Sequence, residues 1–344
     1  MNILQNQEHF STPPYRDHVT PLPEALRRSG LPAWTTSVSL EGSLCGVLLY
    51  LCASRYNVIV SVSLLPAFIY GLLCRLFGKP QALHVCKEFY LEASATKISL
   101  KKRFRLALLR FALKKVDAII LNASAEASYF SDILALPLDR FRFVPWPSAI
   151  SEPQIITDDN GYFLAVGRSL RDWPTFFKAV ENTPYKYVVI AGNVDAKSFP
   201  VMKNVTVLTD VKREEYLNIL SRAKGVILPL KPTIRSTGQA SFLEAMAYGK
   251  PVIVSDVVGV RDYLQHEKNA LLCPSENYLR LRELIVRLAE DTALHKRLAQ
   301  AGFNDINERF NIRRYAEKMV ETITNLLHER NADNIKKSNH KVDI

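Results

Sequence analysis

The segment 237–254 combines residue types that can bind a phosphate and a sugar at the start of one helix. It reads TGQASFLEAMAYGKPVIV, so a glycine-containing turn opens a helix, Gly249 ends it, and an apolar strand follows. The first amides of such a helix lack an intrahelical partner and lie at the positive end of its dipole, which suits a phosphate. One turn further along, the Glu244 carboxylate can accept hydrogen bonds from two sugar hydroxyls. The segment therefore predicts a nucleotide-sugar site.

This segment also resembles a family signature. LEAMAYGKPVIVSD is similar to the signature of the retaining GT-B glycosyltransferases, family four in the usual sequence classification. Other similar segments follow the order of that family and cover most of residues 160–328. They are 162–170 (YFLAVGRSL), 187–193 (YVVIAGN), 223–230 (AKGVILPL), 269–274 (NALLCP) and 308–323 (ERFNIRRYAEKMVETI).

The resemblance implies an α/β fold of the GT-B type, with two Rossmann-like domains that face each other across a cleft. In that family the helix N-terminus holds the donor diphosphate, and the glutamate at the position of Glu244 binds the ribose. The implied activity is a hexosyl transfer from a nucleoside diphosphate to a glycan or lipid-linked acceptor with retention of configuration, in bacterial-type surface polysaccharide or glycolipid synthesis. We expect no metal, and no cofactor apart from the nucleotide sugar as co-substrate.

Further donor-binding residues are expected after two strands of the second half. Gly167 and Arg168 end the AVGR run, where an arginine can hold a diphosphate with bidentate geometry. Arg171 is a candidate for a second cation, and pairing with Asp172 is its structural alternative. Asn193 follows the next strand and is expected near the base.

Four residues directly precede the helix of Glu244: Ser236, Thr237, Gly238 and Gln239. Hydroxyls and a glycine allow a phosphate or sugar to approach closely, although ordinary helix capping needs the same residue types. The family pattern has a second glutamate at the position of Ser236, where it contacts the donor sugar. A serine can hydrogen-bond a sugar but supplies no negative charge beside a developing oxocarbenium ion.

His84 ends a predicted strand over 82–86, and the resemblance places there a histidine that faces the donor sugar across the cleft. A lone histidine after an apolar strand can equally be structural. With Arg168 and Ser236 it completes the predicted catalytic set. The chain departs from the family at Trp173, where a lysine is usual, and in the segment 6–15, which lacks the usual glycine-rich loop.

Composition favours a globular protein with anionic partners. The 344 residues are 48% hydrophobic and 23% charged, and 45 Lys+Arg against 34 Asp+Glu give a net charge of +11. This balance favours phosphate-bearing substrates or phospholipid, and no nucleic-acid-binding signature is visible. The five cysteines form no CxxC pair, so we expect a reduced cytoplasmic protein without a secretory signal.

The segment 99–115 (SLKKRFRLALLRFALKK) is a candidate membrane-contact helix. It holds seven basic residues and no acid. At helical spacing it has one apolar face at Phe104, Leu108 and Phe111, and another at Leu106, Leu109 and Leu113. One face must cover a sheet, and the other suits shallow insertion among anionic headgroups at the inner face of a membrane. A solvated helix with one wide buried face is the simpler alternative.

Alternation of strand and helix patterns organises the chain into two halves. Residues 1–150 form the predicted acceptor domain, which includes a strand over 33–38, and residues 160–310 form the donor domain. Residues 311–328 are expected to form a closing helix that packs toward the first domain, and 329–344 a disordered tail. The apolar stretch 58–74 reads as a buried strand followed by a packed helix and not as a membrane span.

Three other functions remain open from the sequence. An inverting GT-B transferase would need a general base in the first domain, for which Glu88 or His84 could serve. A non-catalytic partner subunit that binds nucleotide or glycan is suggested by Ser236. A basic membrane-associated scaffold would bind lipid without nucleotide.

Overall fold

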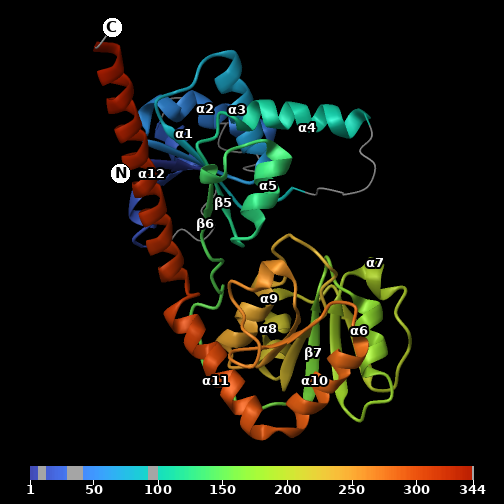
Figure 1. Cartoon of the computed structure of the whole chain (residues 1–344). Helices are drawn as coiled ribbons and strands as arrows, with labels where there is room; N and C mark the ends of the chain where they lie inside the picture. Colours follow the sequence, from blue (N-terminus) through green and yellow to red (C-terminus); the bar gives the residue numbers. More distant parts are fainter. Residues whose placement is uncertain (7–12, 29–41, 92–99, 343–344) are drawn as a thin grey trace. The chain divides into compact units, whose positions relative to one another are not determined.

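The computed structural model describes residues 1–6, 13–28, 42–91 and 100–342, and divides the chain into two compact units (Figure 1). Unit 1 comprises residues 1–144 and 315–344, and unit 2 comprises residues 145–314. Each unit holds a six-stranded sheet, and every strand pairing that the structure describes is parallel. The predicted α/β fold with two Rossmann-like domains is confirmed.

The sheet of unit 1 has the order β2-β1-β3-β4-β5-β6. β-Branched and apolar residues dominate its central strands, as buried parallel strands require. The strands are β1 (Ile3–Gln5), β2 (Val19–Pro21), β3 (Val58–Val62), β4 (Leu83–Lys87), β5 (Ala118–Leu121) and β6 (Phe141–Phe143).

Helices cover both faces of this sheet. One face packs against α12 (Ile312–Val342), which contributes Tyr315, Met319 and Ile323 to the core. The other face packs against α1 (Leu22–Arg28), α2 (Ser43–Cys52), α3 (Leu64–Leu76), α4 (Leu100–Leu113) and α5 (Glu126–Leu134).

The sheet of unit 2 has the order β12-β11-β10-β7-β8-β9. Its strands are β7 (Tyr162–Gly167), β8 (Lys186–Ala191), β9 (Val205–Thr209), β10 (Gly225–Leu228), β11 (Val252–Ser255) and β12 (Leu271–Cys273). Its helices are α6 (Trp173–Val180), α7 (Asn193–Ala196), α8 (Arg213–Ser221), α9 (Gln239–Ala247), α10 (Tyr278–Glu290) and α11 (Thr292–Glu308).

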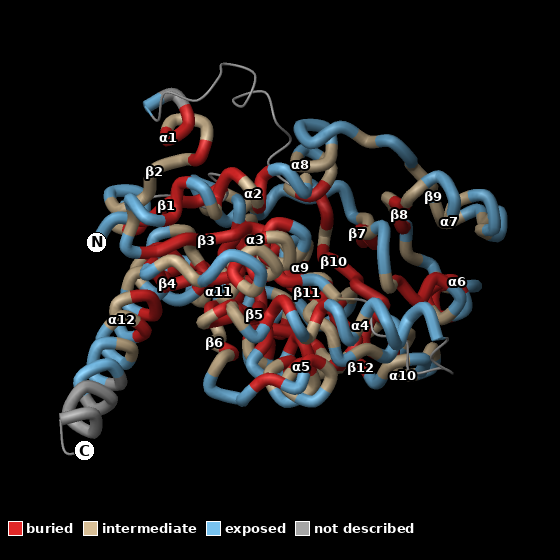
Figure 2. Tube along the Cα trace, turned by 90° about the horizontal axis from the view of Figure 1, so that it is seen from above, coloured by how far each residue is buried: buried red, intermediate tan, exposed pale blue. Residues whose placement is uncertain are grey.

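Alternate residues of each strand in unit 2 enter two different cores, because side chains point to opposite faces of a sheet in turn. Leu164 of β7 packs with α8 and α9, whereas its neighbour Phe163 packs with α6 and α10. The central strands of both sheets are buried along their length (Figure 2). Helices on both faces of the sheet hold the strands in place, and with them the carboxyl ends of the strands, where the candidate site lies.

Three segments differ from the sequence-based expectation or cannot be compared with it. The predicted strand 33–38 lies outside the described residues, and Val19–Pro21 forms β2 instead. Pro66 lies within the first turn of α3, where its missing N–H breaks no intrahelical bond. α12 continues to Val342 through residues for which a disordered tail was expected; the segment 312–342 contains no glycine or proline to end the helix.

No helix among the described ranges is long and apolar enough to cross a bilayer.

Candidate functional site

The sheet of unit 2 reverses its strand order between β7 and β10. From β7 the chain builds β8 and β9 on one side, and from β10 it builds β11 and β12 on the other. The loops that follow β7 and β10 meet at this point: Asp172 N donates to Pro229 O at 2.8 Å, and Lys231 N donates to Leu170 O at 3.0 Å. Ligands of open parallel sheets bind at such switch points, at the carboxyl ends of the strands.

Arg171 is a buried cation at this switch point. Only 7% of the residue is exposed, and its guanidinium donates from Nε to Val166 O at 2.8 Å and from Nη1 to Ser169 O at 3.0 Å. Among the described residues no carboxylate forms an ion pair with it, and Asp172, the alternative partner, accepts from Thr175 N at 3.2 Å. Burial lowers the pKa of Arg171 to about 10. A buried guanidinium without a carboxylate creates a local positive potential that favours an anion.

Gly167 provides the space that Arg171 occupies. Its φ is +146°, and a Cβ at this position would lie 2.2 Å from Nε of Arg171. Gly161 makes a matched comparison, because it also has a positive φ, +71°, but open space around it.

We expect Gly167→Ala to lower the free energy of unfolding of unit 2 by at least about 1 kcal/mol more than Gly161→Ala does, because displacement of the guanidinium adds overpacking to backbone strain. Urea unfolding of the two variants checks this. Equal losses of stability would show that Arg171 does not depend on Gly167 for its position.

Arg168 and Trp173 lie on either side of Arg171 in the sequence, and they differ in how far each is exposed. Arg168 is exposed, directly after β7, and remains available to an incoming ligand. Trp173 is 5% exposed and packs against Phe176 and Phe199 at ring-centroid distances of 6.0 and 5.2 Å. The position where the family has a lysine is therefore part of the hydrophobic core in this chain, and it supplies no cation to the site.

The loop after β10 leads directly into α9. Gly238 has a φ of +86° and stands at the N-cap, with Gln239 as the first helical residue. The Gln239 side chain is buried and donates from Nε2 to Gly259 O at 2.9 Å, and a Cβ on Gly259 would lie 2.7 Å from Cα of Ser236. Gln239 therefore holds the loop against the turn Val258–Val260.

Glu244 lies in the middle of α9 and is almost fully buried. Its side chain is 5% exposed and forms an ion pair from Oε1 to Nη2 of Arg213 at 2.7 Å. Its Oε2 accepts a hydrogen bond from the Tyr216 hydroxyl at 2.9 Å. Burial, and then the Glu244 charge, raises the pKa of Tyr216 well above its usual value. Because an ionised carboxylate has about four acceptor positions, two remain for ligand hydroxyls.

Arg213 and Tyr216 were not predicted as site residues. Both belong to the start of α8, and their spacing of three places them on one helix face. The pattern REEY reads as an ordinary helix start, with nothing in it that points to Glu244, 28 residues beyond Tyr216. Only the packing of α8 and α9 on the same face of the sheet brings them together.

Asn193 is exposed at the carboxyl end of β8, next to β7 in the sheet. It is the first residue of α7. Its Nδ2 donates to Oδ2 of Asp210, which follows β9, at 2.5 Å. The residue thus lies at the carboxyl end of β8, and its amide already has a carboxylate partner.

The position predicted for His84 is wrong. His84 is the second residue of β4, and Lys87 ends the strand. The imidazole is fully buried, its Nε2 lies 3.0 Å from Oγ of Ser61, and its ring packs on Tyr70 at a centroid distance of 4.1 Å. Burial lowers its pKa to about 3. A ring without exposed surface offers no atom to a ligand, so the geometry favours the structural alternative.

Both units match glycosyltransferase family models. The model described as Glycosyl transferases group 1 matches residues 154–305, and the model described as Glycosyl transferase 4-like domain matches residues 5–147. Among curated proteins no sequence matches this chain.

Solved structures share the fold at low sequence identity. Alr3699/HepE from Anabaena, in complex with UDP, is 15% identical with a TM-score of 0.68, covering 94% of this chain and 100% of that one. Sucrose-phosphate synthase from Thermosynechococcus elongatus is 19% identical with a TM-score of 0.66, over 80% and 75% of the two chains. A glycosyltransferase from Rickettsia africae is 12% identical with a TM-score of 0.66, over 95% and 98%. The two family models, one over each unit, thus show that the chain is a glycosyltransferase, and the solved structures show that its fold is of the GT-B type.

Proposed function

We propose that unit 2 binds the nucleoside diphosphate of a donor sugar at the switch point between β7 and β10. The observation that carries this proposal is the buried guanidinium of Arg171, which has hydrogen bonds to main-chain carbonyls but no ion pair with a carboxylate in the described structure. A diphosphate there would also meet the first amides of α9 and the exposed Arg168. Ser236, Thr237 and Gly238 allow its close approach.

Glu244 would bind the ribose within the same site. Its two remaining acceptor positions suit the two ribose hydroxyls, while Arg213 and Tyr216 hold the carboxylate in place. Structures of the Anabaena protein have been solved with UDP and with UDP-glucose. By this analogy we propose a uridine diphosphate hexose as the donor, with the base near Asn193.

The proposed reaction transfers the hexose with retention of configuration to a hydroxyl of a glycan or lipid-linked acceptor, as in surface polysaccharide or glycolipid synthesis. The bond from the anomeric carbon to the β-phosphate oxygen breaks, and the electron pair leaves with the diphosphate. Arg168, Arg171 and the amides of α9 stabilise that charge as it develops. The acceptor oxygen attacks from the same face, and its proton passes to the departing phosphate. This route needs neither a metal nor a further cofactor.

Transfer assays with UDP-hexoses and a panel of glycan and lipid-linked acceptors test the activity, and NMR of the product gives the anomer. Product with the configuration of the donor supports the proposal. Inverted product contradicts retention and indicates a general base in unit 1. UDP binding without turnover across the panel favours a non-catalytic partner subunit, for which the serine at 236 is the motivation.

The outer face of α4 supports a second part of the proposal, contact with a membrane. Leu109 and Leu113 are buried against the unit, whereas Leu100 and Phe104 are 82% and 73% exposed and Leu108 and Phe111 continue the same exposed stripe. Exposed basic residues flank this stripe: Lys101, Lys102, Arg103, Arg105 and Lys114. We propose that α4 inserts shallowly into an anionic lipid surface at the cytoplasmic face, where a lipid-linked acceptor would be available.

We expect replacement of Lys101, Arg103 and Lys114 by glutamate to abolish sedimentation with vesicles that contain phosphatidylglycerol, because three attractive charges become repulsive. Arg110 is left unchanged, since its Nε donates to Ile133 O at 2.8 Å. Replacement of the exposed Lys186, Lys197 and Lys203 in unit 2 alters the net charge equally and should leave sedimentation intact. Vesicle binding that survives the first replacement, or is lost in both, would contradict a role of α4.

A further inference from the structure

A cavity lies at the amino ends of the strands in the unit 2 sheet, whereas the switch point lies at their carboxyl ends. Its volume is about 500 Å³, within the range of small-molecule sites. Lys224 directly precedes β10, and Lys250 stands two residues before β11, so the cavity adjoins the amino ends of these strands. The donor site proposed above uses the carboxyl ends of the sheet. The two sites therefore have no strand end in common.

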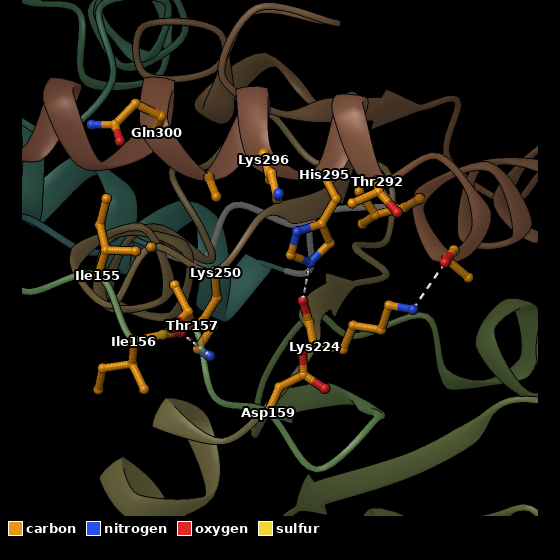
Figure 3. Close-up of a pocket in the computed structure, with 14 residues that line it drawn as sticks. Ile155, Ile156, Thr157, Asp159, Lys224, Lys250, Thr292, His295, Lys296 and Gln300 are labelled. Atoms are coloured by element: carbon orange, nitrogen blue, oxygen red, sulfur yellow. Dashed lines mark hydrogen bonds between the residues drawn. The ribbon is translucent and has the colours of Figure 1, made fainter.

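Three kinds of element form the walls of the cavity (Figure 3). The segment 155–159 forms one side, and residues 292–300 of α11 form the other, with His295 Nε2 at 2.7 Å from Lys224 O. The end of α10 contributes Leu288 and Ala289. Together with Ile155 and Ile156, these side chains give the cavity a substantial apolar wall.

The ionic groups of the lining are predominantly cationic. Lys224, Lys250 and Lys296 line the cavity together with one carboxylate, that of Asp159, among the fourteen lining residues. The Lys250 ammonium donates to Ile156 O at 2.7 Å, and the Lys224 ammonium donates to Ala289 O at 2.9 Å. Both acceptors are neutral carbonyls, and an ammonium has three N–H donors, so each retains capacity for an anionic oxygen.

Two opposing effects act on the charge of the buried Lys250 side chain. Burial lowers its pKa, against the opposing effect of Asp159 and Asp158. Asp159 also accepts a hydrogen bond from Gly161 N at 2.7 Å, which fixes its carboxylate in the turn that starts β7. An anion in the cavity would stabilise the charged form of Lys250 without displacing any of these bonds.

We propose that this cavity binds a small organic phosphate with an apolar body. Three ammonium groups and one carboxylate among the lining residues give an excess of positive charge, which suits a phosphate monoester. Lys296 and Lys250 would contact the phosphate, while the body of the ligand would pack on Ile155 and Leu288. The inference does not depend on the donor site.

The test uses the full chain and 1-naphthyl phosphate as the probe, with 1-naphthol and inorganic phosphate as comparisons, in the presence of saturating UDP. Calorimetric titration should show tighter binding of naphthyl phosphate than of either comparison compound. Lys296→Glu should weaken that binding at least about tenfold, and because Lys296 is exposed this variant retains the fold. Lys203→Glu, at an exposed position outside the cavity lining, should leave the affinity unchanged.

Several results would overturn the proposal. Equal affinity for naphthol would show that the cavity does not select an anion. Unchanged affinity of Lys296→Glu for naphthyl phosphate would place the probe elsewhere, and absence of binding to the unaltered chain would remove the site. A chain that binds no UDP but keeps the Lys296-dependent binding would contradict the donor proposal alone.

Discussion

Glu244→Ala is expected to weaken UDP binding by at least about a hundredfold, because hydrogen bonds from both ribose hydroxyls are lost. Each hydrogen bond from a ribose hydroxyl to an ionised carboxylate contributes about 1.5–3 kcal/mol, and 1.4 kcal/mol corresponds to a tenfold change in affinity. The alanine also removes the charge that holds Arg213 and Tyr216 in place. Isothermal titration of UDP into the two proteins measures the difference.

Two further variants separate a ligand role of Glu244 from a structural one. Tyr216→Phe removes one of the two contacts that Glu244 makes with α8 but leaves the carboxylate and its ion pair with Arg213, so it should lower stability by about 1 kcal/mol and change UDP affinity little. Glu308→Ala removes an exposed carboxylate from α11 and should change neither. If Glu244→Ala binds UDP as tightly as the unaltered chain, Glu244 serves only to join the two helices.

Unit 1 is expected to lose stability below pH 6.5 because of His84. Burial lowers the pKa of its imidazole from 6.5 to about 3, so in this pH range the unfolded chain binds a proton that the folded chain does not. The neutral, buried imidazole of His84 therefore makes its full contribution to the free energy of unfolding above pH 6.5, and this contribution declines as the pH falls toward 3. Between pH 7.5 and 4.5 the loss should be roughly 2–3 kcal/mol, at about 1.4 kcal/mol per pH unit.

A matched pair of substitutions isolates this effect. His84→Gln removes the buried titratable group, and His328→Gln removes an exposed one on α12. In urea titrations at several pH values, the first variant should show a smaller decline of unfolding free energy with acid than the unaltered chain, and the second should follow the unaltered chain. A decline of the same size in both variants would exclude His84 as its cause.

Much of the fold could be predicted because its signals are local. The apolar runs of β7, β10 and β11 predicted the central strands of unit 2, and the LEAMA segment placed Glu244 on the helix that follows β10. Buried parallel strands and a glycine-bounded helix require residue types that adjacent positions reveal. The switch point then follows from the order of the strands, since each βα unit fixes where the next strand can pair.

The rest of the site could not be predicted from the sequence, because it depends on contacts between residues that are far apart in the chain. Nothing near Arg171 in the sequence indicates that Gly167 leaves room for its guanidinium, or that no carboxylate of the described residues pairs with it. Whether His84 ends β4 or lies inside it depends on where the strand stops, and in the structure the strand continues to Lys87. The contact of Arg213 with Glu244 likewise required the packing of two helices.

A crystal structure of the chain with UDP would show whether the switch point of unit 2 binds the nucleotide of the donor. We predict a diphosphate within hydrogen-bond distance of the first amides of α9 and of the Arg171 guanidinium, with both ribose hydroxyls on Glu244. A nucleotide bound away from β7 and β10, or a carboxylate of Glu244 that contacts only Arg213 and Tyr216 in that complex, would contradict this prediction.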